Sequence, residues 1–148
     1  MLYPSARKAF TLVEILIVVV ILGILAAIVI PQFSSATTLA RAGTLAEQLQ
    51  SLNGQIAIYQ ARNRTFPDFT TDGWGALGDA TSMIGGGYMG KAPRNPAWTT
   101  GDSTTISVVS GNVRGSAATA WVFNTDQQQL FASYYNEDTN TVTQTATD

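Results

Sequence analysis

An apolar stretch from Phe10 to Ile30 constrains this chain more than any other feature of its sequence. Almost every residue in the stretch is hydrophobic, and the clear exceptions are Thr11 and Glu14. A helix of that length rises roughly 31 Å, which is enough to cross a bilayer core of about 30 Å. A carboxylate near the start of such a helix costs on the order of 3 kcal/mol unless a cation pairs with it. Glu14 is therefore the residue whose role most needs an explanation.

The composition of the whole chain argues against most catalytic and nucleic-acid-binding functions. Charged residues make up 12% of the 148 residues and the net charge is −2, without the clustered Lys and Arg of a nucleic-acid binder. The chain has no Cys and no His, which removes disulfides, thiolate metal sites and the commonest general base. We therefore expect one domain plus the apolar segment, and a protein that is not an enzyme.

The segment before the apolar stretch, residues 1–9, is short and polar, and it carries Arg7 and Lys8 just before the stretch begins. Positive charge at this position keeps the start of the chain in the cytoplasm, so the rest is expected to lie across the membrane. An ordinary signal anchor and a cleaved secretory signal peptide are alternatives, and Ala26 and Ala27 are similar to a cleavage site. The apolar core here is longer than the ~7–15 residues of an ordinary signal peptide.

The string Lys8-Ala9-Phe10-Thr11-Leu12-Val13-Glu14, followed by the apolar run and Pro31, resembles the N-terminal signal of type IV pilins and type II secretion pseudopilins. In that family a membrane peptidase cuts before the Phe and N-methylates it, so the resemblance implies cleavage between Ala9 and Phe10. The family usually carries Gly before the cut, and this chain departs from the pattern with Ala9.

The resemblance also implies a role for Glu14. In that family the glutamate at this place pairs with the new α-amino group that cleavage creates on a neighbouring subunit. That group is carried here by Phe10. The physics agrees, because two charges buried in an apolar setting are far cheaper together than apart. The alternative is a Glu14 side chain that reaches the lipid headgroups.

Small residues and one proline mark the helix itself. Gly23 and Ala27 form a small-xxx-small pair, which permits close approach of a second helix. Pro31 removes a backbone hydrogen bond and is expected to bend or loosen the helix. After it, apolar residues recur at helical spacing and predict an amphipathic helix that ends near Asn63. This apolar stripe consists of Leu39, Ala42, Leu45, Ala46, Leu49, Leu52, Ile56 and Tyr59.

The rest of the chain predicts a small head that covers this stripe. Three candidate strands lie at residues 104–109, 119–124 and 129–134, with a hairpin turn at 125–128. The fold class we expect is α+β and pilin-like, with a long N-terminal helix packed on a small antiparallel sheet. Its expected parts are a leader (1–9), a transmembrane or filament-core helix (10–30), an amphipathic stem (31–63), a loop-rich segment (64–103), the sheet (104–135) and a flexible tail (136–148).

The loop-rich segment is similar to the major-pseudopilin subgroup in the order of Thr65-Phe66-Pro67, Gly75-Ala76-Leu77 and the stretch from Gly87 to Pro96. Proteins of that subgroup hold a calcium ion in a loop of the sheet region. No carboxylates here form a spaced ligand string, so we assign neither a metal site nor any cofactor. The candidate oxygen donors are Asp102, Asp126, Glu137 and Asp138.

The function we favour is a structural subunit of an extracytoplasmic helical filament, a major pseudopilin of a type II secretion system acting in protein export. Classical pilins often close their C-terminal region with a disulfide, which this Cys-free chain cannot form. The alternatives are a type IV pilus subunit for adhesion, motility or DNA uptake, and a non-polymerising single-pass membrane-anchored binding domain.

The favoured function carries expectations about partners and location. The expected partners are further copies in a helical filament, the inner membrane, a prepilin peptidase, and the secretion or pilus assembly platform with its minor subunits. No nucleic acid is expected. The chain is expected in the bacterial inner membrane, single-pass with its head outside the cytoplasm, and afterwards in a periplasmic or extracellular filament.

Overall fold

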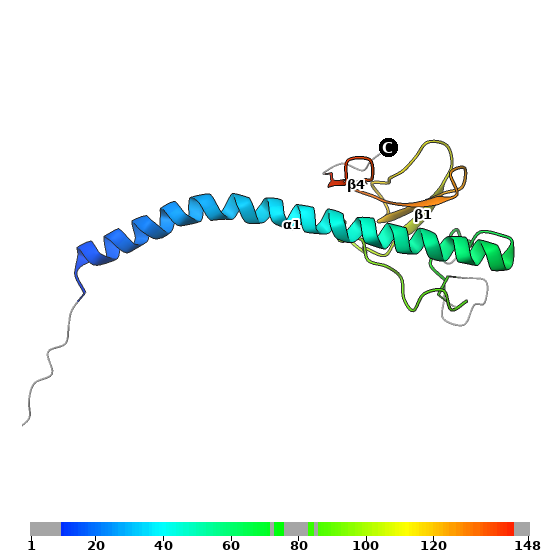
Figure 1. Ribbon diagram of the computed structural model, residues 1–148, viewed down its shortest axis with the longest axis horizontal. Helices are drawn as coiled ribbons and strands as arrows, with labels where there is room; N and C mark the ends of the chain where they lie inside the picture. Colours follow the sequence, from blue (N-terminus) through cyan, green and yellow to red (C-terminus); the bar gives the residue numbers. More distant parts are fainter. Residues whose placement is uncertain (1–9, 72, 76–82, 85, 144–148) are drawn as a thin grey trace, which may run out of the picture. The chain divides into compact units, whose positions relative to one another are not determined.

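The computed structural model describes residues 10–71, 73–75, 83, 84 and 86–143, and for residues 31, 32 and 34 it describes the backbone alone. One long helix, α1 (Leu12–Asn63), precedes five short strands (Figure 1). These are β1 (Ile106–Val109), β2 (Trp121–Asn124), β3 (Gln129–Ala132), β4 (Tyr135–Asn136) and β5 (Thr141–Val142). The expected α+β, pilin-like fold is confirmed. The chain divides into two compact units, Met1–Thr37 and Thr38–Asp148.

The first unit carries the apolar half of α1, and its side chains are not covered by the chain itself. Large apolar side chains from Phe10 to Ile30 are between 42% exposed at Val29 and 82% exposed at Leu12. Among the described residues, α1 is the one helix long and apolar enough to cross a membrane by length and composition. The helix continues through Pro31, and the expected bend at that residue stays a prediction.

The second unit is built around the amphipathic half of α1. Its apolar stripe is buried as expected, except that Leu39 is 68% exposed and Ala46 is only partly covered. The stripe packs against Trp121, Phe123 and Leu130 of the sheet and against loop residues such as Phe69. Burial of a large apolar side chain contributes roughly 1.5–3 kcal/mol, so this contact is the main source of stability for the unit. The buried stripe residues are Ala42, Leu45, Leu49, Leu52, Ile56 and Tyr59.

A polar contact fixes where the sheet sits on the helix. The Asn53 side chain donates to the carbonyl of Leu130 at 3.2 Å, and its Oδ1 accepts the Leu130 N–H at 2.8 Å. Asn53 thereby satisfies both backbone groups of one residue in strand β3. Because an unpaired backbone group at a half-buried edge is costly, this pair favours one position of β3 along α1.

The sheet is mixed, which corrects the prediction of an antiparallel sheet. Strand β2 pairs antiparallel with β3 through the expected turn at residues 125–128, but β1 pairs parallel with β2. The reason is the connection formed by residues 110–120, which is long enough to return the chain to the end of the sheet where β1 began. Buried Asn124 holds this connection, since its side-chain amide donates to the carbonyls of Gly111 and Val113.

The predicted flexible tail is wrong for residues 136–143. Strands β4 and β5 form a short antiparallel pair there, and the Thr143 N–H donates to the Tyr134 carbonyl at 2.9 Å. The turn between them is closed by Asn140, which has a φ of 50° and accepts a hydrogen bond from the Tyr135 hydroxyl. Asn tolerates this left-handed conformation better than most residues. Residues 144–148 lie outside the described part of the chain.

A second buried asparagine joins the loop-rich segment to the sheet. The Asn95 side-chain amide donates to the carbonyls of Ala120 at 2.7 Å and Ser133 at 2.9 Å, and its Oδ1 accepts the Ala97 N–H at 2.8 Å. Asn95 is 1% exposed. One buried side chain therefore joins three chain segments by hydrogen bonds.

Candidate functional site

The start of α1 is organised by a reciprocal pair of hydrogen bonds between Thr11 and Glu14. One oxygen of Glu14, Oε2, accepts the Thr11 backbone N–H at 2.9 Å and the Thr11 hydroxyl at 2.9 Å. The Thr11 hydroxyl oxygen in turn accepts the Glu14 backbone N–H at 3.3 Å. This is a capping box, in which the residue before the helix and the third helical residue satisfy two backbone donors that have no helical partner.

The capping box orients the one carboxylate of the apolar segment. Both protein contacts of the Glu14 carboxylate use Oε2. An ionised carboxylate offers about four acceptor positions on its two oxygens, so Oε1 can accept further donors while the cap stays in place. A Thr-x-x-Glu pattern before an apolar run is a sequence signal for this arrangement, and our sequence analysis missed it.

The other predicted processing and assembly residues lie at separate places along the same unit. Phe10 is 81% exposed and directly precedes the capping box, while Ala9 lies outside the described residues. Gly23 has open space around the position where a Cβ would be, and Ala27, one turn further on, is exposed. The structure brings Thr11 and Glu14 together, and it leaves Gly23 and Ala27 free to face another helix.

The candidate oxygen donors in the second unit serve local contacts. Asp102 accepts the Thr104 hydroxyl and N–H at 2.7 and 2.9 Å, and these bonds lower the pKa of Asp102 below its ordinary value. Asp126 accepts the Gly111 N–H at 2.6 Å. Within the described part of the chain no group of three or more acidic side chains is placed to hold a metal ion.

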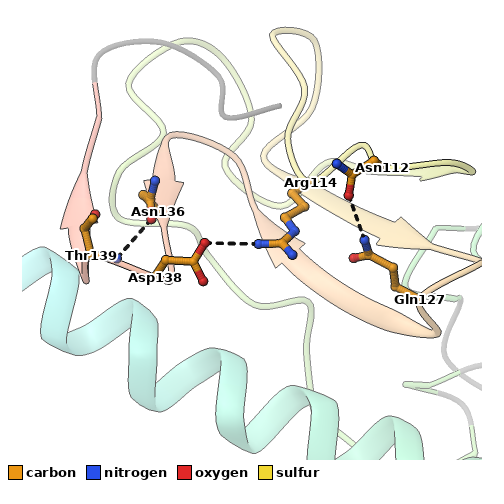
Figure 2. Close-up of polar contacts among 6 residues, drawn as sticks. All are labelled: Asn112, Arg114, Gln127, Asn136, Asp138 and Thr139. Carbon is orange, nitrogen blue, oxygen red and sulfur yellow. Dashed lines mark hydrogen bonds and ion pairs between the residues drawn. The ribbon is translucent and has the colours of Figure 1, made fainter.

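Glu137 and Asp138 are neighbours in sequence, but they differ sharply in their burial and in their polar contacts. Asp138 forms an ion pair with Arg114 at 3.4 Å across to the loop before β2 (Figure 2). Glu137 Oε1 is buried and has no hydrogen-bond partner among the described residues. Burial raises the pKa of Glu137, Asp138 raises it further, and Arg114 opposes both.

Comparison with known proteins agrees with these features. Residues 4–30 match the family described as the prokaryotic N-terminal methylation motif. Over 97 residues the chain is 33% identical to the type II secretion system core protein G of Klebsiella pneumoniae, covering 61% of this chain and 69% of that protein. It is 33% identical over 116 residues to core protein G of Vibrio cholerae, covering 69% of this chain and 77% of that protein. A fimbrial protein of Moraxella nonliquefaciens is 34% identical over 88 residues, covering 60% of this chain and 54% of that protein.

No solved structure matches the chain, so the assignment depends on sequence similarity together with the fold. The long N-terminal helix, the methylation motif and the similarity to core protein G point the same way. The chain belongs to the type II secretion system core protein G family, the major pseudopilins.

Proposed function

We propose that the mature chain is the main structural subunit of an extracytoplasmic helical filament that acts in protein export by a type II secretion system. The observation that carries this proposal is the exposed apolar half of α1, from Phe10 to Ile30. Such a surface is stable only in lipid or against other apolar helices. A filament subunit needs both environments in turn, first the membrane and then the packed helices of its neighbours.

Processing at the N-terminus links the two states. Cleavage between Ala9 and Phe10 removes Arg7 and Lys8, which leaves six basic and ten acidic residues and a net charge of −4. The cut also removes the positive residues that favour a fixed position in the membrane. A prepilin peptidase would make this cut and methylate Phe10, with the chain single-pass in the inner membrane and its head outside the cytoplasm.

The new amine of Phe10 would pair with Glu14 of an adjacent copy and set the axial register of the filament. The capping box supports this step, because it points Oε2 of Glu14 at Thr11 and leaves Oε1 as an acceptor. An ammonium group and a carboxylate in an apolar core stabilise each other strongly compared with either charge alone. The same pairing repeated at every copy gives an open, head-to-tail assembly.

The remaining assembly residues are proposed to act by allowing close packing. Gly23 and Ala27 leave room for a neighbouring helix to approach, and Pro31 would let the helix adjust where the two halves meet. The role is structural rather than catalytic, and no cofactor is part of it. A cytoplasmic ATPase of the assembly platform would supply the energy for extraction from the membrane.

The test compares Glu14→Ala with Glu47→Ala, a second exposed carboxylate of α1. We expect Glu14→Ala to insert in the membrane normally and to form few or no filaments, and Glu47→Ala to retain cleavage and insertion. Electron microscopy of sheared filaments and N-terminal mass analysis are the measurements. Normal filaments from Glu14→Ala, or a mature chain that still begins at Met1, would overturn the proposal.

The similarity to a fimbrial protein keeps a pilus as the second candidate function. Deletion of the gene separates the two functions, because loss of protein export with normal motility and DNA uptake indicates a secretion pseudopilin. The opposite pattern indicates a pilus subunit.

A further inference from the structure

The charged residues of α1 differ in whether the chain itself occupies them. The helix carries Glu14, Arg41, Glu47 and Arg62. The capping box holds Glu14, and the Arg62 guanidinium lies over the Tyr88 ring, 5.8 Å from its centroid. Arg41 and Glu47 are both exposed, and neither has a hydrogen bond or an ion pair within the described part of the chain.

Glu47 differs in this respect from the other exposed carboxylates that the structure describes. Each of those accepts a hydrogen bond from its own chain, and they belong to Glu14, Asp68, Asp102, Asp126 and Asp138. A solvated carboxylate on a surface is stable without a partner. Glu47 therefore becomes informative only through its position along α1 relative to an accessible cation.

Arg41 is such a cation, and it borders a pocket of about 430 Å³ in the second unit. Thr38 and Thr99 line the same pocket, and Ala97 and Tyr134 contribute to its wall. The pocket leaves room beside Arg41 for a side chain of another copy. A guanidinium with its five N–H donors, next to threonine hydroxyls that also donate, suits a carboxylate as that side chain.

The proposed contact between Phe10 and Glu14 defines how far adjacent copies are displaced. The amine of the first copy lies level with a residue four places further along the second copy, a rise of about 6 Å. Identical copies in a helical filament keep the same axial displacement at every residue. Residue 41 of the first copy is therefore level with residue 45 of the second, and Glu47 lies two residues, or about 3 Å, beyond it.

This displacement selects Arg41 and Glu47 over the other combinations on α1. It brings Arg62 level with residue 66, which lies beyond the end of the helix at Asn63. A displacement in the opposite sense would leave Arg41 ten residues, or about 15 Å, from Glu47. Neighbouring helices pack about 8–10 Å apart, a gap that exposed Arg and Glu side chains span from both sides.

We propose that Arg41 of one copy forms an ion pair with Glu47 of the adjacent copy that also binds its Phe10 amine. The proposal rests on the proposed filament, and it adds a second register contact in the stem. Both pairs place the cation on the first copy and the carboxylate on the second. Such an interface joins two different surfaces, so it generates an open chain of copies rather than a closed dimer.

Exchange of the two charges tests the pair. Arg41→Glu and Glu47→Arg each bring like charges together, and each should lower the assembled fraction about fivefold. The double variant restores opposite charges in reversed order and should assemble like wild type. Lys91→Glu is the matched control, because it changes the net charge as Arg41→Glu does, at an exposed position outside α1, and it should assemble like wild type. Electron microscopy of sheared filaments measures assembly, and thermal unfolding shows that each head remains folded.

Introduced cysteines give a second readout, because the natural chain has no Cys. A disulfide needs two Cα atoms within about 7 Å, whereas residues 41 and 47 of one helix are separated by a rise of about 9 Å. The double variant of Arg41→Cys and Glu47→Cys therefore forms disulfides only between copies. Mild oxidation of its filaments should give a ladder of linked multimers on a non-reducing gel, and either single variant should give dimers at most.

The outcomes separate the two proposals. Undiminished assembly of both single charge variants overturns the Arg41–Glu47 contact, and so does a double variant that stays as impaired as they are. An equal loss in Lys91→Glu, or oxidised filaments without a ladder, also overturns it. In all these cases the wild-type filament remains. A wild-type chain that forms no filaments contradicts the proposed function itself.

Discussion

Replacement of Asn95 by alanine is the perturbation whose magnitude the structure defines best. The substitution removes three hydrogen bonds, made with Ala97, Ala120 and Ser133. The Ala120 carbonyl keeps its hydrogen bond from the Ser133 N–H at 3.0 Å. The two groups that lose their hydrogen-bond partner are therefore the Ala97 N–H and the Ser133 carbonyl. Each buried group left without a partner costs about 1–3 kcal/mol, which gives a loss of about 4 kcal/mol in the free energy of unfolding.

Thermal unfolding of the full-length protein in detergent, followed by circular dichroism in the β-sheet region, measures this loss. For a head of this size 1 kcal/mol shifts the Tm by about 4 °C, so Asn95→Ala should lower it by about 15 °C. The matched control is Asn112→Ala, because Asn112 is exposed and accepts one hydrogen bond, from Gln127 at 3.2 Å (Figure 2). Its effect should stay within about 0.5 kcal/mol. An Asn95→Ala loss below about 1 kcal/mol would refute the claim that this side chain holds three segments together.

Three further predictions concern the two ends of the chain. Thr11→Ala should weaken the start of α1 by about 1 kcal/mol and slow assembly, whereas Thr11→Ser should preserve both the helix start and the assembly rate. Hydrogen exchange of the Glu14 amide measures this, and it should become faster in Thr11→Ala alone. Equal exchange rates in the two variants would contradict the prediction. Because the pKa of Glu137 is raised in the folded head, the folded state binds this proton more tightly than the unfolded state, and stability falls as pH rises from the ordinary to the raised pKa. Glu137→Gln should therefore be more stable than wild type at pH 7, and its stability should not fall over this pH range. Denaturant unfolding across pH 4–8 measures both effects. A Glu137→Gln variant that is less stable than wild type at pH 7 would contradict the prediction. Ala9→Gly should be cleaved as well as or better than wild type in a pulse-chase experiment, and a loss of cleavage would argue against the cut before Phe10.

Local patterns in the sequence predicted the elements that depend on neighbouring residues. The apolar stripe from Ala42 to Tyr59 predicted a helix with one buried face, because 3.6-residue periodicity places those residues together. The turn at residues 125–128 predicted the β2–β3 hairpin, since both strands and their connection are local. The capping box of Thr11 and Glu14 was equally readable from four residues. It was missed because Glu14 was considered only for contacts outside its own chain, with another subunit or with the lipid headgroups.

The contacts between distant segments could not be predicted in the same way. The parallel pairing of β1 and β2 depends on the path of residues 110–120, which Asn124 holds from outside that loop. The β4–β5 pair depends on Tyr135 being buried against the core, which polar composition alone did not indicate.

The sequence by itself determined the apolar helix, the processing signal and the family, because each is written in consecutive or regularly spaced residues. Only the tertiary structure decided which polar side chains are buried and whether they have partners. Asn95 and Glu137 are both polar residues in loop-like surroundings in the sequence. The fold gives Asn95 three hydrogen bonds and leaves Glu137 Oε1 with none among the described residues. The physical reason is that burial and pairing depend on distant segments, which for Asn95 lie 25 and 38 residues away along the chain.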